Sequence, residues 1–399
     1  MRIVLFLSAL TGGGAQRRML LLARGFAAAG QEVEIVTARA EPPAQRPPLP
    51  RGVTHHPLAC PIAGLPWLRH RRGLWVPAVW HRLAAYLRRE RPDVLLSTST
   101  PANLTALLAR AVSGTGTPLV LALNLDLAAS LGRGLGAALD LPRRVAGLYR
   151  RAEMRVAISE GVADGYRRLL GGEDAAVVTV PNPVDLAAVV RGARAVPEPA
   201  WTDADGRPLL LACGKFKPQK DFATLIRATA LLSRRRPVRL AILGEGEERR
   251  RLLHLARELG LGGHLWMPGF VANPFAWMAR ASAFVLSSRF EGSSNVLLEA
   301  LACGCPVVAT DCPSGPRELL AGGRYGRLVP VGDAEALAAA IDACLDAPRD
   351  SARLRARAAE FSIERAVAGY LAAIAEARRR RVAADRARAG GQARLRGAR

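Results

Sequence analysis

The sequence predicts an α/β protein made of two doubly wound, Rossmann-like domains. A chain of 399 residues is too long for one hydrophobic core and fits two domains of roughly 100–200 residues each. Short apolar runs alternate with segments of helical spacing, which is the pattern of parallel sheets covered by helices. We expect domains over residues 1–185 and 208–360, joined by a linker at 186–207 that contains Pro197 and Pro199.

In the first domain, apolar runs predict strands at residues 1–8, 33–37, 53–58, 92–97, 118–123, 155–159 and 176–180. Three glycines, Gly12, Gly13 and Gly14, stand between the first strand and a helix predicted at 15–29. Glycine lets the backbone approach a ligand closely, and the N-terminus of the following helix favours an anion. An ordinary tight turn would also explain these glycines.

The second domain repeats the pattern, with strands at 208–213, 238–243, 265–270, 283–288 and 306–310. A polar or glycine-rich loop follows each strand, near positions 214, 244, 269, 291 and 314. Because parallel sheets bind ligands outside the carboxyl ends of their strands, we expect these loops to meet at one edge and form one site.

Two carboxylates belong to this predicted edge. Glu291 lies in the loop after the strand at 283–288, and Glu299 follows inside a helix. Leu297 and Leu298 precede Glu299, and a carboxylate in apolar surroundings needs donors, of which a sugar diol offers two. The alternatives are a solvated helix residue and a loop charge.

Cations come from two of the same loops. Lys215, Lys217 and Lys220 are the only lysines among 57 basic residues, and all of them follow the strand at 208–213. An ammonium group beside the carboxyl end of a strand is a natural ligand for a diphosphate, although chance could also cluster the lysines. Arg317 adds a guanidinium from the loop near 314.

The stretch SSRFEGSSNVLLEALACGCPVVATDCPSGPREL resembles the nucleotide-sugar site of the retaining glycosyltransferases of family 4. These enzymes have the GT-B fold, with two domains facing across a cleft, and their hallmark of Glu, seven residues, Glu is matched by Glu291 and Glu299. The resemblance implies that Glu291 lies beside the donor sugar and diphosphate and that Glu299 binds the ribose hydroxyls. It also implies that Lys220 grips the diphosphate with Lys215, which stands where the family has arginine. Glu291, Lys215 and Lys220 are therefore the expected catalytic residues.

The resemblance extends to the other loops of the chain. It implies donor binding by Glu299, Gly244, Gly246, Phe270, Gly292, Ser293, Asn295 and Arg317. In the first domain, the loop of Gly12, Gly13 and Gly14 would face the diphosphate and the acceptor. Asn124 and Asp126 would lie on the acceptor side, where many relatives carry a histidine or a charged residue.

The boundary between the domains also matches the family. Pro181-Asn-Pro-Val-Asp resembles the family's turn, with Pro183 in place of glycine. The resemblance implies that a helix at 361–377 crosses back to the first domain. The arginine-rich residues 378–399 are expected to be a disordered basic tail or a charge anchor.

These features predict a retaining transferase that moves a hexose or N-acetylhexosamine from a UDP- or GDP-linked sugar. The expected acceptor is a glycan or a polyprenyl-linked glycan in the synthesis of cell-surface polysaccharide or glycolipid. No cofactor or metal is expected, because the lysines can neutralise the diphosphate. The alternatives are a sugar-nucleotide epimerase, a phosphorylase, which would need a pyridoxal-binding lysine outside 215–220, and a non-catalytic sugar-nucleotide-binding protein.

The formal net charge of +23 indicates anionic partners. No zinc-finger, RNA-recognition or basic-zipper motif is present, so we expect no nucleic acid. Segment 61–91 interleaves Trp67, Trp75, Trp80 and Tyr86 with many arginines. It is either an ordinary amphipathic helix with a basic solvent side or a patch that binds an anionic membrane, and we favour the patch.

A helix that starts near Pro77 would bury one stripe, consisting of Val76, Val79, Trp80, Leu83 and Leu87, and would leave Arg82, Tyr86 and Arg89 on another face.

No apolar run approaches the ~18 residues that span a bilayer, and the run at 3–10 is interpreted as a strand rather than a signal peptide. The six cysteines match no zinc pattern and are expected to be reduced. We therefore expect a cytoplasmic bacterial protein, peripheral on the cytoplasmic face of the inner membrane.

Overall fold

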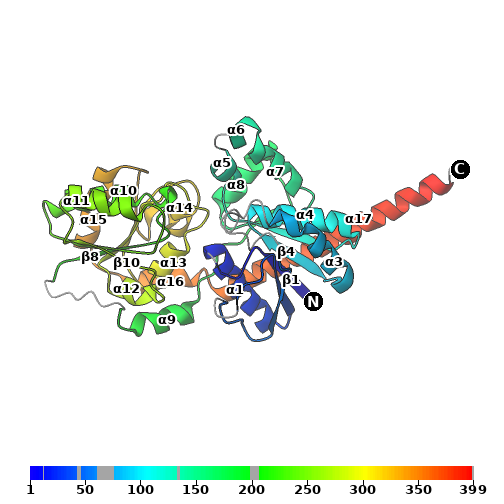
Figure 1. Ribbon diagram of the computed structural model, residues 1–399, viewed down its shortest axis with the longest axis horizontal. Coiled ribbons are helices and arrows are strands. Elements are labelled where there is room, and N and C mark those ends of the chain that lie inside the picture. The colour runs from blue at the N-terminus through cyan, green and yellow to red at the C-terminus, as the bar shows by residue number, and fades with distance from the viewer. Residues whose placement is uncertain (12, 43–45, 61–75, 133–134, 198–205, 398–399) are drawn as a thin grey trace. The chain divides into compact units, whose positions relative to one another are not determined.

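The computed structural model describes residues 1–11, 13–42, 46–60, 76–132, 135–197 and 206–397. The chain forms two compact units. The first consists of Met1–Pro183 and Ile363–Arg399, and the second of Val184–Ser362. Each unit contains one parallel sheet and its own hydrophobic core (Figure 1).

Unit 1 holds a seven-stranded sheet in the order β3-β2-β1-β4-β5-β6-β7. The strands are β1 (Arg2–Leu7), β2 (Glu32–Thr37), β3 (Val53–Pro57), β4 (Val94–Thr98), β5 (Leu119–Leu123), β6 (Met154–Ala157) and β7 (Val177–Thr179). All neighbouring strands pair in parallel. The strand order reverses between β1 and β4, so their carboxyl ends flank a switch point at which such sheets bind ligands.

The helices of unit 1 cover both faces of its sheet (Figure 1). They are α1 (Gly14–Ala28), the short 3-10 helix η3 (Pro77–Val79), α3 (Trp80–Glu90), α4 (Thr100–Ser113), α5 (Leu127–Leu131), α6 (Leu135–Ala138), α7 (Leu141–Tyr149), α8 (Glu160–Leu170) and α17 (Ile363–Gly397). Side chains alternate along β1, so Leu5 packs with α1 and α17, whereas Phe6 packs with α3 and α4. Burial on both faces explains why the inner strands β1 and β5 are apolar along almost their whole length.

Unit 2 holds a six-stranded parallel sheet in the order β10-β9-β8-β11-β12-β13. The strands are β8 (Leu209–Cys213), β9 (Arg239–Leu243), β10 (Leu265–Gly269), β11 (Ala283–Leu286), β12 (Val307–Thr310) and β13 (Arg327–Val329). The helices are α9 (Leu186–Arg194), η4 (Pro218–Lys220), α10 (Phe222–Ser233), α11 (Arg249–Glu258), α12 (Pro274–Arg280), α13 (Asn295–Ala302), α14 (Pro316–Leu319), η5 (Ala321–Gly323), α15 (Ala334–Asp346) and α16 (Ser351–Ala359). The switch point of this sheet lies between β8 and β11.

The start of the predicted linker at 186–207 is a helix, α9, and not a linker. At its start, the Asp185 side chain accepts a hydrogen bond from Ala188 N (3.0 Å). Val189 is buried in the core of unit 2, and such a capped, one-sided helix is stable in spite of its few residues. Pro197, which suggested the linker, follows the helix.

The C-terminal segment is helical beyond its predicted end. α17 continues to Gly397, through the region from 378 that the sequence predicted to be disordered. Its first half packs on the sheet of unit 1, where Tyr370 is fully buried. Further along, Arg380 pairs with Glu376 one turn earlier, and such i,i+4 pairs in an alanine-rich segment stabilise a helix.

α3 differs from the predicted orientation at one aromatic residue. Tyr86 is only 2% exposed, rather than lying on the basic face. Its hydroxyl donates a hydrogen bond to Glu34 Oε2 (2.7 Å), and its ring centre lies 5.3 Å from that of His56. Helical spacing does not reveal such a partner on a distant strand. The rest of the predicted stripe is buried, namely Val76, Val79, Leu83 and Leu87, except that Trp80 is half-buried. Five further residues of the segment lie outside the described residues: Trp67, Arg69, Arg71, Arg72 and Trp75.

Candidate functional site

The loops at the carboxyl edge of unit 2 lie next to one another in the order of their strands. The loop after β8 contacts the loop after β9, where Phe216 N donates to Glu245 O (2.9 Å). The loop after β9 contacts the end of β10, where Gly244 N donates to Gly269 O (2.8 Å). These backbone bonds bring three of the predicted loops together.

Three further hydrogen bonds join the loop after β8 to the loop after β11. They run from Arg289 N to Gln219 O (2.8 Å), from Gln219 Nε2 to Phe290 O (2.9 Å) and from Ser287 Oγ to Lys220 O (2.8 Å). The backbone of Lys220 is therefore fixed at the switch point of the sheet.

Lys220 and Glu291, two of the predicted catalytic residues, form an ion pair across these two loops. Lys220 Nζ lies 2.6 Å from Glu291 Oε1, and Ser288 Oγ donates to the same oxygen at 2.7 Å. Glu291 is 7% exposed, so water screens this pair less than it would a surface pair. An ammonium group has three donors, so Lys220 can bind an anion while it keeps Glu291.

Gly244 and Gly246 have a packing role. A Cβ on Gly244 would lie 2.0 Å from the carbonyl oxygen of Gly214, and one on Gly246 would lie 2.4 Å from that of Phe216. Only glycine allows the loops after β8 and β9 to approach so closely. The donor contact expected for these two glycines stays a prediction.

Glu299 is directed into the unit and not into solvent. It lies on α13, is 6% exposed, and its charge acts on two buried thiols. Burial first, and then the charge of Glu299, raise the pKa of Cys303 to about 12 and that of Cys213 well above its ordinary value. Cys213 ends β8, so Glu299 lies near the switch point, and the alternative of a solvated helix residue is excluded.

The N-terminus of α13 offers donors at the same edge. Ser294 precedes the helix and is 2% exposed, and its hydroxyl has no hydrogen-bond partner within the described part of the chain. Asn295 begins the helix, and the first N–H groups of a helix favour an anion. A Cβ on Gly315 would lie 3.0 Å from Ser293 Cα, so the loop after β12 packs closely on Gly292 and Ser293.

The remaining predicted donor residues are exposed. Arg317 Nε donates to Asp311 Oδ1 (3.0 Å) and its Nη2 pairs with the other carboxylate oxygen, so Asp311 occupies its guanidinium fork. This hydrogen bonding raises the pKa of Arg317. Lys215 is exposed, and Phe270, directly after β10, is 83% exposed. The structure thus leaves a lysine and an aromatic ring accessible at this edge.

In unit 1, a buried acid that the sequence analysis missed holds the start of the glycine loop. Glu41 is 2% exposed and accepts hydrogen bonds from Leu10 N (2.6 Å), Thr11 N (3.0 Å), the Thr11 hydroxyl and Arg39 Nη2 (3.1 Å). Burial alone would raise the pKa of Glu41, but these hydrogen bonds outweigh it and lower the pKa.

The glycines themselves continue into α1. Gly13 N donates to Gln16 Oε1 (3.0 Å), and Gly14 is the first residue of the helix. Both glycines are exposed, and Gly12 lies outside the described residues. The backbone of Gly13 and Gly14 therefore stays accessible at the carboxyl end of β1.

A buried arginine joins the carboxyl ends of three other strands. Arg18, on α1, is 2% exposed and donates to Thr98 Oγ1 (2.8 Å), Asn124 Oδ1 (2.7 Å) and Asn182 Oδ1 (3.1 Å). These acceptors end or follow β4, β5 and β7, and all are neutral. The predicted acceptor-side residue Asn124 is thus held by a guanidinium that the sequence analysis did not single out.

Asp126 has a local structural contact. Its Oδ1 accepts hydrogen bonds from Ala128 N (2.7 Å) and Ala129 N (3.1 Å) at the start of α5. Its other oxygen lies 3.9 Å from Arg168 Nη2. An acceptor role for Asp126 stays a prediction.

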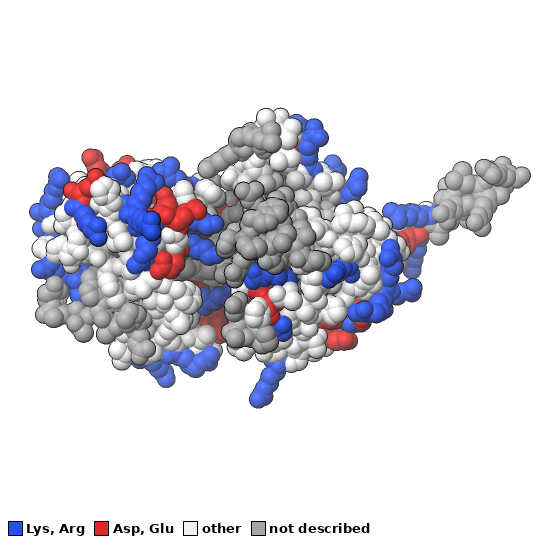
Figure 2. All heavy atoms as spheres, viewed as in Figure 1, with Lys and Arg blue, Asp and Glu red and all other residues white. Residues whose placement is uncertain are grey.

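Basic side chains occur on both units. Figure 2 shows Lys and Arg side chains spread over both units on the face in view, with acidic residues among them. No group of three or more His, Cys, Asp or Glu able to hold a metal ion occurs among the described residues. None of the described helices is both long and apolar enough to cross a bilayer.

Two family models match the chain in succession. Glycosyltransferase Family 4 matches residues 12–188, and Glycosyl transferases group 1 matches residues 207–347. The crystal structure of HepE from Anabaena in complex with UDP-glucose is similar with a TM-score of 0.72 at 19% identity, over 93% of this chain and 99% of that chain. Together with the two parallel sheets, this similarity establishes the GT-B fold.

Characterised relatives point to the same class. The N-acetylgalactosamine-N,N'-diacetylbacillosaminyl-diphospho-undecaprenol 4-alpha-N-acetylgalactosaminyltransferase of Campylobacter jejuni is 37% identical over 44% of this chain. That match spans 48%, or about half, of the relative's length. Phosphatidyl-myo-inositol mannosyltransferase of Mycolicibacterium smegmatis is 29% identical over 87% of this chain and 85% of its own. The chain belongs to the family 4 glycosyltransferases.

Proposed function

We propose that this glycosyltransferase moves a sugar from a nucleotide-diphosphate sugar to a glycan or lipid-linked glycan, with retention of configuration. The observation that carries the proposal is the Lys220–Glu291 pair at the switch point of unit 2, on the same edge as the buried Glu299. A cation for the diphosphate and two carboxylates for hydroxyl groups are thus gathered on one edge of one sheet.

The proposed reaction proceeds on one face of the sugar. The bond between the sugar C1 and the diphosphate oxygen breaks while a bond from an acceptor hydroxyl oxygen to C1 forms, and the acceptor proton passes to the departing diphosphate. Lys220 and Lys215, with the N–H groups at the start of α13, stabilise the negative charge that develops. Attack from the leaving-group side needs no strong protein base, which fits Asn124 in place of a histidine.

The carboxylates divide the donor between them. Oε1 of Glu291 is occupied by Lys220 and Ser288, so we assign its Oε2 to a hydroxyl of the donor sugar. Glu299 accepts from the ribose hydroxyls, because two neighbouring hydroxyl groups offer two donors to one carboxylate. Phe270 offers an exposed ring on which a nucleobase can stack.

The names of the relatives favour particular substrates. The HepE crystal structure contains UDP-glucose, which favours a UDP-linked donor over a GDP-linked one. The Campylobacter enzyme is named for a diphospho-undecaprenol acceptor and transfers N-acetylgalactosamine. A hexose or N-acetylhexosamine transferred to a lipid-linked glycan, in cell-surface polysaccharide or glycolipid synthesis, is therefore the assignment we propose.

We propose that the reaction needs no metal, because the lysines of the loop after β8 can neutralise the diphosphate. Turnover is then expected to be unchanged by a chelator such as EDTA. A loss of turnover that added Mg²⁺ or Mn²⁺ restores would contradict this part of the proposal.

Two measurements test the function. Thermal-shift screening of nucleotide sugars should raise the melting temperature for the true donor, because a ligand of the folded state stabilises it by mass action. Release of free nucleotide diphosphate on addition of glycan acceptors then shows transfer. Binding without release would support the non-catalytic alternative, and conversion of the donor sugar without an acceptor would support the epimerase.

We also propose that the protein binds the cytoplasmic face of the inner membrane through the basic segment 61–91 and acts on an acceptor there. Each arginine near an anionic surface contributes about 1 kcal/mol at low salt. Combined neutralisation of Arg69, Arg71 and Arg72 should weaken sedimentation with anionic vesicles more than deletion of residues 378–399. Equal sedimentation of both variants and the wild type would contradict the membrane role.

A further inference from the structure

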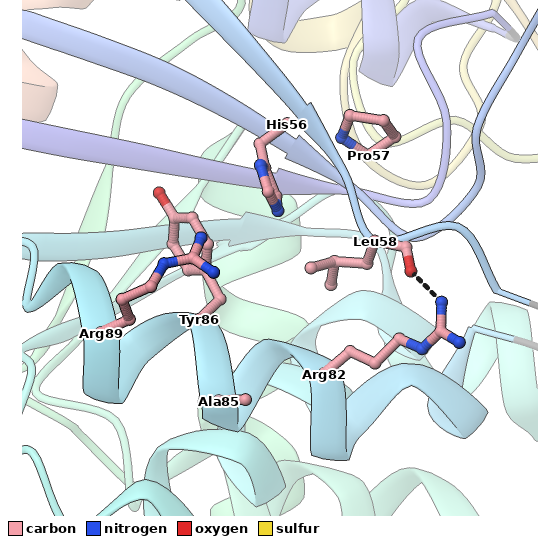
Figure 3. Close-up of a pocket in the computed structure, with 7 residues that line it drawn as sticks. All are labelled: His56, Pro57, Leu58, Arg82, Ala85, Tyr86 and Arg89. Carbon is pink, nitrogen blue, oxygen red and sulfur yellow. Dashed lines mark hydrogen bonds between the residues drawn. The ribbon is translucent and has the colours of Figure 1, made fainter.

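A hollow of about 220 Å³ lies between the edge strand β3 and helix α3 of unit 1 (Figure 3). Its lining contains none of the residues assigned above to the donor or the acceptor. At about 30 Å³ per water molecule, it has room for roughly seven waters. It is smaller than the ~300–1,000 Å³ of typical pockets for drug-sized ligands, so it suits a small group and not a whole nucleotide sugar.

The spacing of residues on α3 creates the hollow. Arg82, Ala85, Tyr86 and Arg89 occupy positions i, i+3, i+4 and i+7, which share one face of a helix. The single methyl group of Ala85 leaves a gap between the two arginines (Figure 3). The Tyr86 hydroxyl is bonded to Glu34, so the tyrosine contributes its ring to the wall and not a free hydroxyl.

Arg82 is held in place by neutral hydrogen-bond acceptors and not by a carboxylate. Arg82 Nη1 donates to the carbonyl oxygens of Leu58 (2.7 Å) and Ala59 (2.6 Å), as the dashed line in Figure 3 shows for Leu58. Both acceptors are neutral, and Arg82 forms no ion pair with any described residue. The guanidinium therefore keeps its full charge in a set position at one end of the hollow.

The rest of the lining adds a second guanidinium and an imidazole. Arg89 Nε lies 2.6 Å from Glu90 Oε1, a carboxylate that also pairs with Arg2 (2.8 Å), and Arg2 pairs in addition with Glu34 (2.8 Å). The imidazole of His56 lies beside the Tyr86 ring (Figure 3). Among the residues that the structure describes, no aspartate or glutamate lines the hollow. An anion is the ligand that such a lining attracts.

We propose that this hollow binds the phosphate group of a phosphate ester. A carboxylate is planar and is satisfied by one guanidinium fork, whereas a phosphate presents several oxygens to donors on different sides. Arg89 and His56 lie at one end of the hollow and Arg82 lies at the other (Figure 3), so an anion in the hollow has donors on more than one side. The ester is either a phospholipid headgroup or a soluble phosphorylated compound. The proposal does not depend on the transfer reaction, so either one can fail without the other.

Four variants separate the hollow from the general basic surface. Ala85→Leu fills the gap and leaves every charge in place, and Arg82→Gln removes the fixed guanidinium. Arg88→Gln removes a neighbouring charge that donates to Val112 O (2.9 Å) and does not line the hollow. Ala111→Leu adds the same bulk at an exposed position of α4. Equal melting temperatures for the two leucine variants will show that Ala85→Leu folds normally.

The full-length protein is titrated with glycerol phosphate by calorimetry and sedimented with phosphatidylcholine vesicles that contain phosphatidylglycerol. Ala85→Leu and Arg82→Gln should each weaken binding about tenfold or more, the first because the added side chain occupies the hollow and the second because a charge-assisted contact is lost. Arg88→Gln should weaken vesicle binding at most about fivefold, and Ala111→Leu should have no effect.

The two probes identify the source of the phosphate. Binding of glycerol phosphate that Ala85→Leu abolishes assigns a soluble ester, and binding only of the anionic vesicles, abolished in the same way, assigns a lipid headgroup. The proposal is overturned if the wild type binds neither probe, if Ala85→Leu binds like the wild type, or if Arg88→Gln loses as much as Arg82→Gln.

Discussion

The carboxyl edges of the two sheets use charge in opposite ways. In unit 2, Lys220 forms an ion pair with Glu291, and the Lys220 side chain remains 17% exposed. In unit 1, Arg18 is buried and donates to neutral hydroxyl and amide groups, and Glu41 accepts hydrogen bonds from the backbone of the loop before α1. The comparison indicates that Lys220 of unit 2 is accessible enough to bind a ligand. Arg18 and Glu41 of unit 1 instead bind other groups of their own unit and stabilise its loops.

The largest effect should come from the cation of unit 2. Lys220→Ala is expected to lower kcat by about two to three orders of magnitude, because one stabiliser of the developing charge is lost. Lys217→Ala, an exposed lysine of the same loop, is the control and should change kcat little. Lys215→Arg, the residue usual in the family, should stay within a few-fold. Near-normal turnover of Lys220→Ala would place the diphosphate elsewhere.

The buried acid of unit 2 should follow. Glu299→Gln keeps the shape of the side chain but loses charge-assisted bonds to the ribose, so donor binding should weaken by roughly 1.5–3 kcal/mol. Calorimetry with the donor and its 2′-deoxy analogue measures the effect. The analogue should bind the wild type worse than the donor, and this difference should vanish in the variant. Unchanged donor affinity in a folded variant would remove the ribose assignment.

The buried acid of unit 1 should affect stability and not donor binding. The pKa of Glu41 in the folded chain lies below its ordinary 4.5, so its ionised form stabilises the fold above about pH 4.5. That contribution is lost as the pH falls through the lower folded-state pKa. Glu41→Gln should therefore cost about 1–2 kcal/mol at neutral pH, and the difference from the wild type should shrink on acidification. Denaturant unfolding at pH 7 and near pH 3 tests this, and a constant difference would contradict it.

The smallest effect on folding should come from Arg18. Arg18→Met loses three hydrogen bonds but also relieves the desolvation of a buried charge, so the free energy of unfolding should change by about 1 kcal/mol or less. The acceptor KM should rise nonetheless, because Asn124 loses the guanidinium that orients it. Arg17→Met, at an exposed position on the same helix, should leave the KM unchanged. A large loss of stability with an unchanged KM would make Arg18 purely structural.

The contrast between the two sheet edges also explains which functional residues could be predicted from the sequence. The edge of unit 2 was predictable because its strand–helix–strand unit at 283–310 is continuous, and because Lys220 and Glu291 each stand in a loop directly after a buried strand. Placement at the end of a parallel strand fixes the edge on which a side chain lies, whatever the separation along the chain. The predicted convergence of the loops therefore needed no knowledge of long-range contacts.

The edge of unit 1 was not predictable in this way. Glu41 lies in a proline-rich loop, 30 residues from the Thr11 N–H that it accepts, and nothing local marks it as buried. Arg18 is one of many arginines, and its partner Asn124 lies 106 residues away. The helix α9 was also missed, although Asp185 followed by an apolar stripe is a usable helix start signal.

The buried thiols allow the two units to be followed separately. All six cysteines are buried thiols outside disulfide bonds, and burial raises the pKa of Cys303, Cys305 and Cys312 to about 12. Alkylating reagents need an accessible thiolate, so the folded chain should resist them and each unit should react only as it opens. Cys60 belongs to unit 1 and the other five cysteines to unit 2. Mass spectrometry of timed alkylation would thus report a separate opening rate for each unit of the unmodified protein.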